Sequence, residues 1–146
     1  MATIETSITI GKPISDVYRA VTAYDSPGEM QKWRTAVQSI GITAGSPLRT
    51  GSMIAMTKMF LGSKIFVNVD ITDLQRNKRI ELKGMHGRFP FTRSIEFSPS
   101  GRETIIRDKI DVRTSWVFFF YTPFLTSNLT RQVKQEWQAL KQLLED

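Results

Sequence analysis

Hydrophobic and polar residues alternate at the start of the chain and through most of its middle. In residues 3–10, Ile4, Ile8 and Ile10 share one side of an extended segment, which is the period-two pattern of a strand with one buried face. From residue 35 to residue 113, short runs of strand-forming residues are separated by glycine, proline, serine and asparagine. This spacing predicts about six further strands, joined in order as antiparallel hairpins.

Helical spacing of apolar residues follows the first strand. Pro13 suits the start of a helix and Asp16 favours its positive end, so we predict a short helix over residues 14–24. A second short helical turn is expected over residues 26–33.

The longest predicted element closes the chain. Thr122 and Pro123 have the character of an N-cap followed by proline at the first helical position, and a helix over residues 123–145 would be roughly 35 Å long. One of its faces is apolar and carries Leu125, Leu129, Val133, Trp137, Leu140 and Leu144. Together these patterns predict an α+β fold: a curved antiparallel sheet of about seven strands, two short helices after the first strand, and the long C-terminal helix across the sheet.

Length and composition fit a single domain over residues 1–146. The chain has 146 residues, of which 40% are hydrophobic, so we expect one buried core. It contains no cysteine, which excludes disulfides and thiolate chemistry. The first residues lack the basic and apolar regions of a secretory signal, and no apolar stretch is long enough to cross a bilayer, so a cytoplasmic location is expected.

Basic residues outnumber acidic ones, 20 against 14, which gives a formal net charge of +6. A surplus of this sign attracts nucleic acid, anionic lipid or acidic ligands. The basic residues are scattered from Lys12 to Lys141 without a run of four, and no nucleic-acid motif is present. We therefore expect no specific nucleic acid partner, and interpret the charge as a solubility feature first and a sign of anion binding second.

Five short sequence motifs follow one another along the chain: residues 12–22 (KPISDVYRAVT), 30–33 (MQKW), 47–52 (PLRTGS), 97–104 (FSPSGRET) and 137–145 (WQALKQLLE). Over essentially the whole chain this order resembles the SRPBCC superfamily, which includes START lipid-transfer domains, the major birch pollen allergen and polyketide cyclases. The resemblance implies the helix-grip fold, in which a sheet wraps around the long helix. It also implies a cavity between them that often holds a sterol, lipid, hormone or polyketide.

From this resemblance we expect a small, mainly apolar ligand (a lipid, polyketide or aromatic molecule) and no cofactor. Methionine-rich residues 53–60 suit a cavity that adapts to its occupant, although filling the core is the more common role of such residues. The expected ligand contacts are Met53, Met59, Val67, Val69, Leu82, His86, Arg93, Ile106, Asp108, Phe119, Leu125, Leu129, Val133 and Trp137.

Three of these contacts are polar and are the candidates for chemistry. Strand parity, taken from the apolar residues, turns His86, Arg93 and Asp108 inward on neighbouring strands. They could anchor a carbonyl, hydroxyl or carboxylate, or serve as acid–base groups in a cyclase or dehydratase. Alternatively, Arg93 and Asp108 form an ion pair near the rim while His86 faces water. A slip in register would instead turn inward the cations Arg107, Lys109 and Arg113.

Other classes of site have no support. One histidine and no cysteine make a zinc or iron site improbable, so no metal is expected. Neither a glycine-rich phosphate loop nor a nucleophile elbow is present.

The aromatic residues 116–121 (WVFFFY) precede the last helix. They could form a gate at the cavity mouth, a lipid-facing surface, or a strand end packed on both sides. Three classes of function therefore stay open: a carrier or sensor, a cyclase, dehydratase or hydrolase, and a protein-interaction or membrane-surface module with peripheral membrane contact.

Overall fold

A computed structural model describes residues 2–146. Its elements, in chain order, are β1 (Ala2–Ile10), α1 (Ile14–Val21), α2 (Pro27–Gln31), β2 (Val37–Ala44), β3 (Met53–Phe60), β4 (Ser63–Gln75), β5 (Arg79–His86), β6 (Phe89–Ser100), β7 (Glu103–Val112), a short 3-10 helix (Trp116–Phe118) and α3 (Thr122–Glu145).

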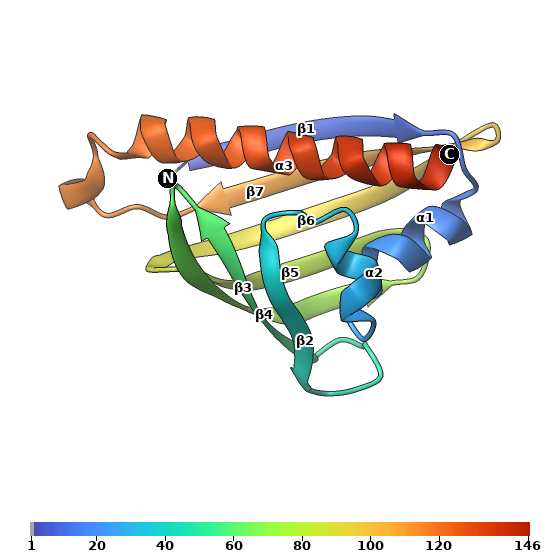
Figure 1. Ribbon diagram of the computed structural model, residues 1–146, viewed down its shortest axis with the longest axis horizontal. Helices are drawn as coiled ribbons and strands as arrows, with labels where there is room; N and C mark the ends of the chain where they lie inside the picture. The colour runs from blue at the N-terminus through green and yellow to red at the C-terminus, as the bar shows by residue number, and fades with distance from the viewer. Residues whose placement is uncertain (1) are drawn as a thin grey trace.

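The strands form one seven-stranded sheet in the order β1-β7-β6-β5-β4-β3-β2. Every neighbouring pair is antiparallel, since β2 to β7 follow one another as hairpins and β1 returns to pair with β7. Figure 1 shows α3 lying across the sheet alongside β1, with α1 near its C-terminal end. The sheet and the long helix are therefore arranged as predicted, in a helix-grip fold.

The core lies between the inner face of the sheet and α3. On β7, Ile106, Asp108 and Ile110 are buried while the alternating Arg107 and Lys109 are exposed, so the predicted strand parity is confirmed. The buried face of α3 carries Leu125, Leu129, Val133, Glu136, Trp137 and Leu140. Packing of this face against the sheet excludes water from apolar surface, which is the main force holding the helix in place.

The two ends of the core are closed by other elements. At one end Trp33, just after α2, stacks on Trp137 with ring centroids 5.6 Å apart. Near the same end the backbone amide of Gly11 donates a hydrogen bond to the Glu145 carboxylate at 2.7 Å. At the other end Phe118 packs edge-on against Phe89 at 5.3 Å. The helix is thus held at both ends.

The boundaries of all three predicted helices need correction. The first helix stops at Val21 rather than at residue 24, and beyond it the amide of Tyr24 donates to the carbonyl of Thr22, a tighter turn than that of an α-helix. The second helix ends at Gln31 rather than at Trp33. The last helix includes Thr122, and Tyr121 precedes it in a helical conformation. The Thr122 hydroxyl donates to the carbonyl of Phe118 instead of capping an amide.

The aromatic residues 116–121 do not form a strand end packed on both sides, so that interpretation was wrong. They form a 3-10 helix (Trp116–Phe118) followed by a turn over residues 119–121, and Trp116 is 86% exposed and Phe120 is 92% exposed. None of the helices in residues 2–146 combines the length and apolarity that crossing a bilayer requires.

Candidate functional site

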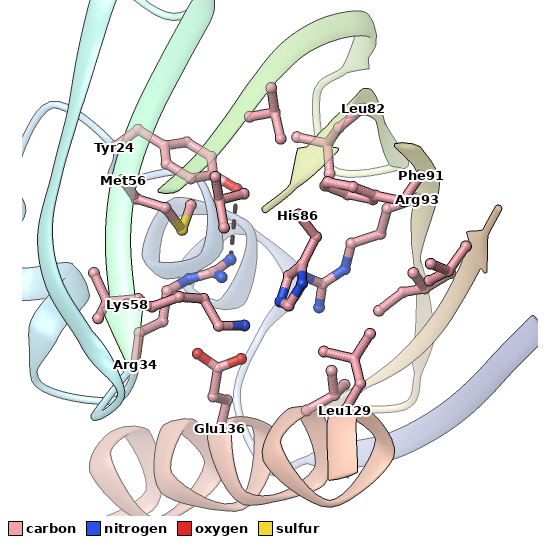
Figure 2. Close-up of a pocket in the computed structure, with 16 residues that line it drawn as sticks. Tyr24, Arg34, Met56, Lys58, Leu82, His86, Phe91, Arg93, Leu129 and Glu136 are labelled. Atoms are coloured by element: carbon pink, nitrogen blue, oxygen red, sulfur yellow. Dashed lines mark hydrogen bonds between the residues drawn. The ribbon is translucent and has the colours of Figure 1, made fainter. Parts of the chain in front are cut away.

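A cavity of about 50 Å³ lies between the inner face of the sheet and α3. Figure 2 shows its lining side chains pointing toward a common centre from the strands, from α3 and from the segments beside α2. The wall consists of Tyr24, Arg34, Val37, Met56, Lys58, Val67, Val69, Leu82, His86, Phe91, Arg93, Ile110, Val112, Leu129, Val133 and Glu136.

Secondary-structure periodicity explains how these side chains come together. Met56 and Lys58 are two residues apart on β3, so both point to the inner face. On α3, Leu129, Val133 and Glu136 recur at intervals of four and three residues and share the face turned toward the sheet. Apart from Tyr24 and Arg34, which lie in the connecting segments on either side of α2, the cavity wall is therefore built on strands and on α3.

Arg93, which lines the cavity, forms a buried ion pair with Asp108 behind the cavity wall. The guanidinium of Arg93 donates two hydrogen bonds to the Asp108 carboxylate, from Nε at 2.9 Å and from Nη2 at 2.6 Å. Trp137 Nε1 donates a third hydrogen bond to the same carboxylate at 3.0 Å. Burial opposes the charge on Arg93, but the attraction and hydrogen bonds of Asp108 outweigh it and raise the pKa of Arg93.

His86 lies at the end of β5 with its ring in contact with Phe60, at a centroid distance of 4.9 Å. Its Nε2 atom is buried and has no hydrogen-bond partner within residues 2–146. Burial, together with the nearby positive charge of Lys58, lowers the pKa of His86 to about 3. The ring is therefore neutral at physiological pH and can exchange a hydrogen bond with an occupant, but not as an imidazolium.

Lys58 and Glu136 bring opposite charges into the cavity from β3 and α3. Both side chains are buried, and within the described chain neither has an ion-pair partner within 4.0 Å. Burial lowers the pKa of Lys58 to about 8, although Glu136 opposes this change. Figure 2 shows both charged ends directed into the cavity.

Arg34 supplies a third cation from the segment between α2 and β2. Its guanidinium lies over the ring of Trp33 at 4.6 Å and reaches the Tyr24 hydroxyl at 3.5 Å. Its Nε atom is buried and has no acceptor in residues 2–146. Buried donors normally have partners, so this atom marks a position where an acceptor is missing.

The predicted contacts fall into three groups. Val67, Val69, Leu82, His86, Arg93, Leu129 and Val133 line the cavity. Ile106, Leu125 and Trp137 are buried in the core outside the cavity lining, and Asp108 lies behind Arg93. The remaining three, Met53, Met59 and Phe119, are 48%, 37% and 71% exposed.

The placement of Met53, Met59 and Phe119 on the cavity wall is therefore corrected. Met53 and Met59 have the opposite parity on β3 to the buried Ile54 and Met56, so they point to the outer face of the sheet. Phe119 belongs to the exposed turn before α3.

Four polar wall residues were missed: Tyr24, Arg34, Lys58 and Glu136. One signal was available for Lys58, because it shares its parity with the apolar Ile54 and Met56. A charge at such a position is unusual, since lysine is almost never fully buried without a partner.

A second hollow adjoins the cavity. It is an open groove of about 680 Å³ along β3, β4 and the start of α3, and His86 lines both the groove and the cavity. Lys64, Arg88 and Phe124 also line the groove. His86 is thus the residue that the groove and the cavity share.

The chain is similar to known proteins in both sequence and fold. A family model described as "Polyketide cyclase / dehydrase and lipid transport" matches residues 1–145. A search of curated proteins finds no match for the chain.

Solved structures share the fold at low sequence identity. A START superfamily protein from Mycobacterium smegmatis is 14% identical with a TM-score of 0.80, and the match covers 98% of this chain and 97% of that one. Ara h 8.0201 is 15% identical with a TM-score of 0.74 and 99% of both chains covered. Major latex-like protein 151 from Panax ginseng is 10% identical with a TM-score of 0.71, covering 96% of this chain and 95% of that one.

Proposed function

Because the chain belongs to the polyketide cyclase/dehydrase and lipid transport family, we propose that it binds a small molecule in the cavity between the sheet and α3. The observation that carries this proposal is the pair of buried polar atoms, His86 Nε2 and Arg34 Nε, which have no partner in residues 2–146 and belong to cavity-lining residues. An occupant would supply the missing hydrogen bonds. The surrounding aliphatic and aromatic wall suits an apolar body.

The size of the cavity limits the occupant. A volume of about 50 Å³ holds about four water-sized groups, at roughly 10–15 Å³ for each. A lipid or polyketide therefore needs the wall to move. Met56 and Leu129, which line the cavity, have flexible side chains that can move in this way.

Native mass spectrometry of protein purified from its own host tests this proposal. We expect a small molecule at one equivalent per chain, identified after extraction. Leu129→Phe enlarges a wall residue and should abolish its retention, whereas Gln138→Phe, on the exposed side of α3, should not. Retention that is equal in both variants would place the molecule elsewhere and contradict the proposal.

The alternative of a cyclase or dehydratase using His86, Arg93 and Asp108 has less support. Both oxygens of Asp108 accept hydrogen bonds from Arg93 or Trp137, and Asp108 is not part of the cavity wall. The low pKa of His86 leaves it a poor proton acceptor at neutral pH. No hydrogen bond joins His86 to either of the other two.

Peripheral membrane binding is a second candidate function, favoured by the exposed residues before and at the start of α3. Trp116, Val117, Phe119, Phe120 and Phe124 are all more than half exposed, and aromatic side chains of this kind favour the membrane interface. The cations Lys64 and Arg88 line the neighbouring groove and would attract anionic lipid. Such docking would place the groove against the bilayer.

Sedimentation with vesicles of anionic and of neutral lipid tests this candidate. We expect salt-sensitive binding to anionic vesicles that Phe120→Ser and Trp116→Ser reduce severalfold. Met53→Ser removes an exposed apolar side chain from β3 and serves as the matched control. Binding that persists unchanged in the two aromatic variants would contradict this candidate.

A further inference from the structure

Three cations and two carboxylates surround the cavity. Arg34, Lys58 and Arg93 line it together with Glu136, and Asp108 is bonded to Arg93 from behind. His86 is neutral, so three formal positive charges against two negative ones leave one positive charge in a buried site.

The excess charge belongs to Arg34 and Lys58. Arg93 is satisfied by Asp108, through two hydrogen bonds of 2.9 and 2.6 Å. Lys58 and Arg34 have no ion pair within 4.0 Å in residues 2–146. Arg34 has the 3.5 Å hydrogen bond to Tyr24 and the contact with the ring of Trp33, neither of which supplies a negative charge. Lys58 is 8% exposed and Arg34 is 4% exposed, so bulk water solvates their charges poorly. Buried charges are normally paired.

We propose that the cavity occupant carries a single negative charge, such as a carboxylate on a small apolar body, and that Lys58 and Arg34 bind it. This inference rests on the proposed function, since it names the chemical class of the ligand. A carboxylate accepts from an ammonium and from a guanidinium edge, including the free Nε of Arg34. His86 Nε2 is then available to a second polar atom of the ligand.

The carboxylate of Glu136 determines how much negative charge a ligand must bring to make the cavity neutral. It faces the same cavity as Lys58 and offsets one of the two free cations. A monoanion therefore brings the site to neutrality, while a dianion leaves a surplus negative charge in a buried space. Removal of the Glu136 charge should strengthen anion binding.

The test is an NMR titration of the full chain at pH 7, which detects weak binding through amide shifts of cavity residues. The probes are propionate, its neutral counterpart propionamide, and the dianion malonate. We expect propionate to bind at least tenfold more tightly than either of the other two. Lys58→Met should weaken propionate binding tenfold or more and leave propionamide unchanged, while Glu136→Gln should strengthen propionate binding severalfold.

Two further variants control for the net charge of the protein and for a failure of Lys58→Met to fold. Lys134→Met removes an exposed cation from the outer side of α3 and should leave propionate affinity unchanged, which separates the cavity from the net charge of the protein. Arg34→Gln replaces Lys58→Met if the latter does not fold.

Propionamide binding as tightly as propionate, or propionate failing to shift cavity amides, would overturn the anion inference. The proposed function is judged separately by the copurified molecule. A neutral occupant in the cavity would uphold ligand binding and overturn only its charge, whereas retention unaffected by Leu129→Phe would overturn the function itself.

Discussion

Arg93 on β6 holds Asp108 on β7 through two parallel hydrogen bonds, at 2.9 and 2.6 Å, with the carboxylate almost completely buried. The two residues are not directly opposite in the ladder, because Arg93 faces Ile110 and Asp108 faces Ile95. The pair is therefore a diagonal bridge between neighbouring strands. Trp137 extends it to α3 through the hydrogen bond at 3.0 Å.

We predict that Asp108→Leu destabilises the protein by about 3–5 kcal/mol, because it leaves the guanidinium of Arg93 buried without its partner. Urea denaturation measures the change in the free energy of unfolding. The double variant Arg93→Met with Asp108→Leu should recover most of the loss, since it removes both charges. A loss in the single variant below about 1 kcal/mol would mean that the pair contributes little.

Lys58 should make stability depend on pH in a defined window. Its pKa is about 8 in the folded protein and 10.5 in the unfolded chain, so between these values the unfolded state binds more protons. Stability should therefore rise with pH across this window, by at most about 3 kcal/mol. The measurement is the free energy of unfolding of wild type relative to Lys58→Met between pH 8 and pH 10.5, where His86 is neutral in both proteins.

Lys58→Met should also be the more stable protein at pH 7, since it removes a buried charge that lacks a close partner. The advantage should shrink as the pH approaches 10.5. A difference that does not change between pH 7 and 10 would contradict the depressed pKa of Lys58. Propionate affinity should fall over the same range as Lys58 loses its proton.

His86 should remain neutral far below the usual range of histidine. Burial and the cations Lys58 and Arg93 lower its pKa from 6.5 to about 3, so stability should be lost as the pH falls through the interval between these values. Ring chemical shifts of His86, followed by NMR from pH 8 to pH 4.5, should show no titration. A midpoint between pH 6 and 7 would show instead that the ring is reached by water.

Gly84 on β5 should tolerate no larger residue. A Cβ there would collide with the backbone carbonyl of Asn68 on β4, so Gly84→Ala must push two paired strands apart. We expect a loss of about 3 kcal/mol in unfolding free energy. Gly28→Ala is the matched control, because nothing lies within 4 Å of its added Cβ and alanine favours the helix. Equal stability of the two variants would contradict the close approach.

The fold could be predicted from the sequence because its strands have one apolar face. On β4 and β7 this alternation fixed which residues point inward, and it placed Asp108 in the core correctly. On β3 both faces carry apolar residues, since Met53 and Met59 alternate with Ile54 and Met56. The abundance of methionine alone then favoured Met53 and Met59 as wall residues, and the inward position of Lys58 was not predicted.

The polar side of the cavity could not be predicted for a different reason. Glu136 lies three residues after Val133 and four before Leu140, so its spacing places it on the apolar face of α3, but a glutamate is usually solvated and was not expected there. Arg34 lies in a connecting segment without periodicity. Their convergence depends on how the helix and the connection pack on the sheet, which no local pattern encodes.

Strands β2 to β7 and α3 all contribute residues to the cavity wall. The main-chain hydrogen bonds of β3 to β7 are already used within the sheet, where each of these strands has a neighbour on both sides. Substitutions can therefore change the chemistry of the cavity wall one side chain at a time while the hydrogen bonds of the sheet stay the same. Proteins that share this architecture at 10–15% identity can diverge in what they recognise without diverging in shape.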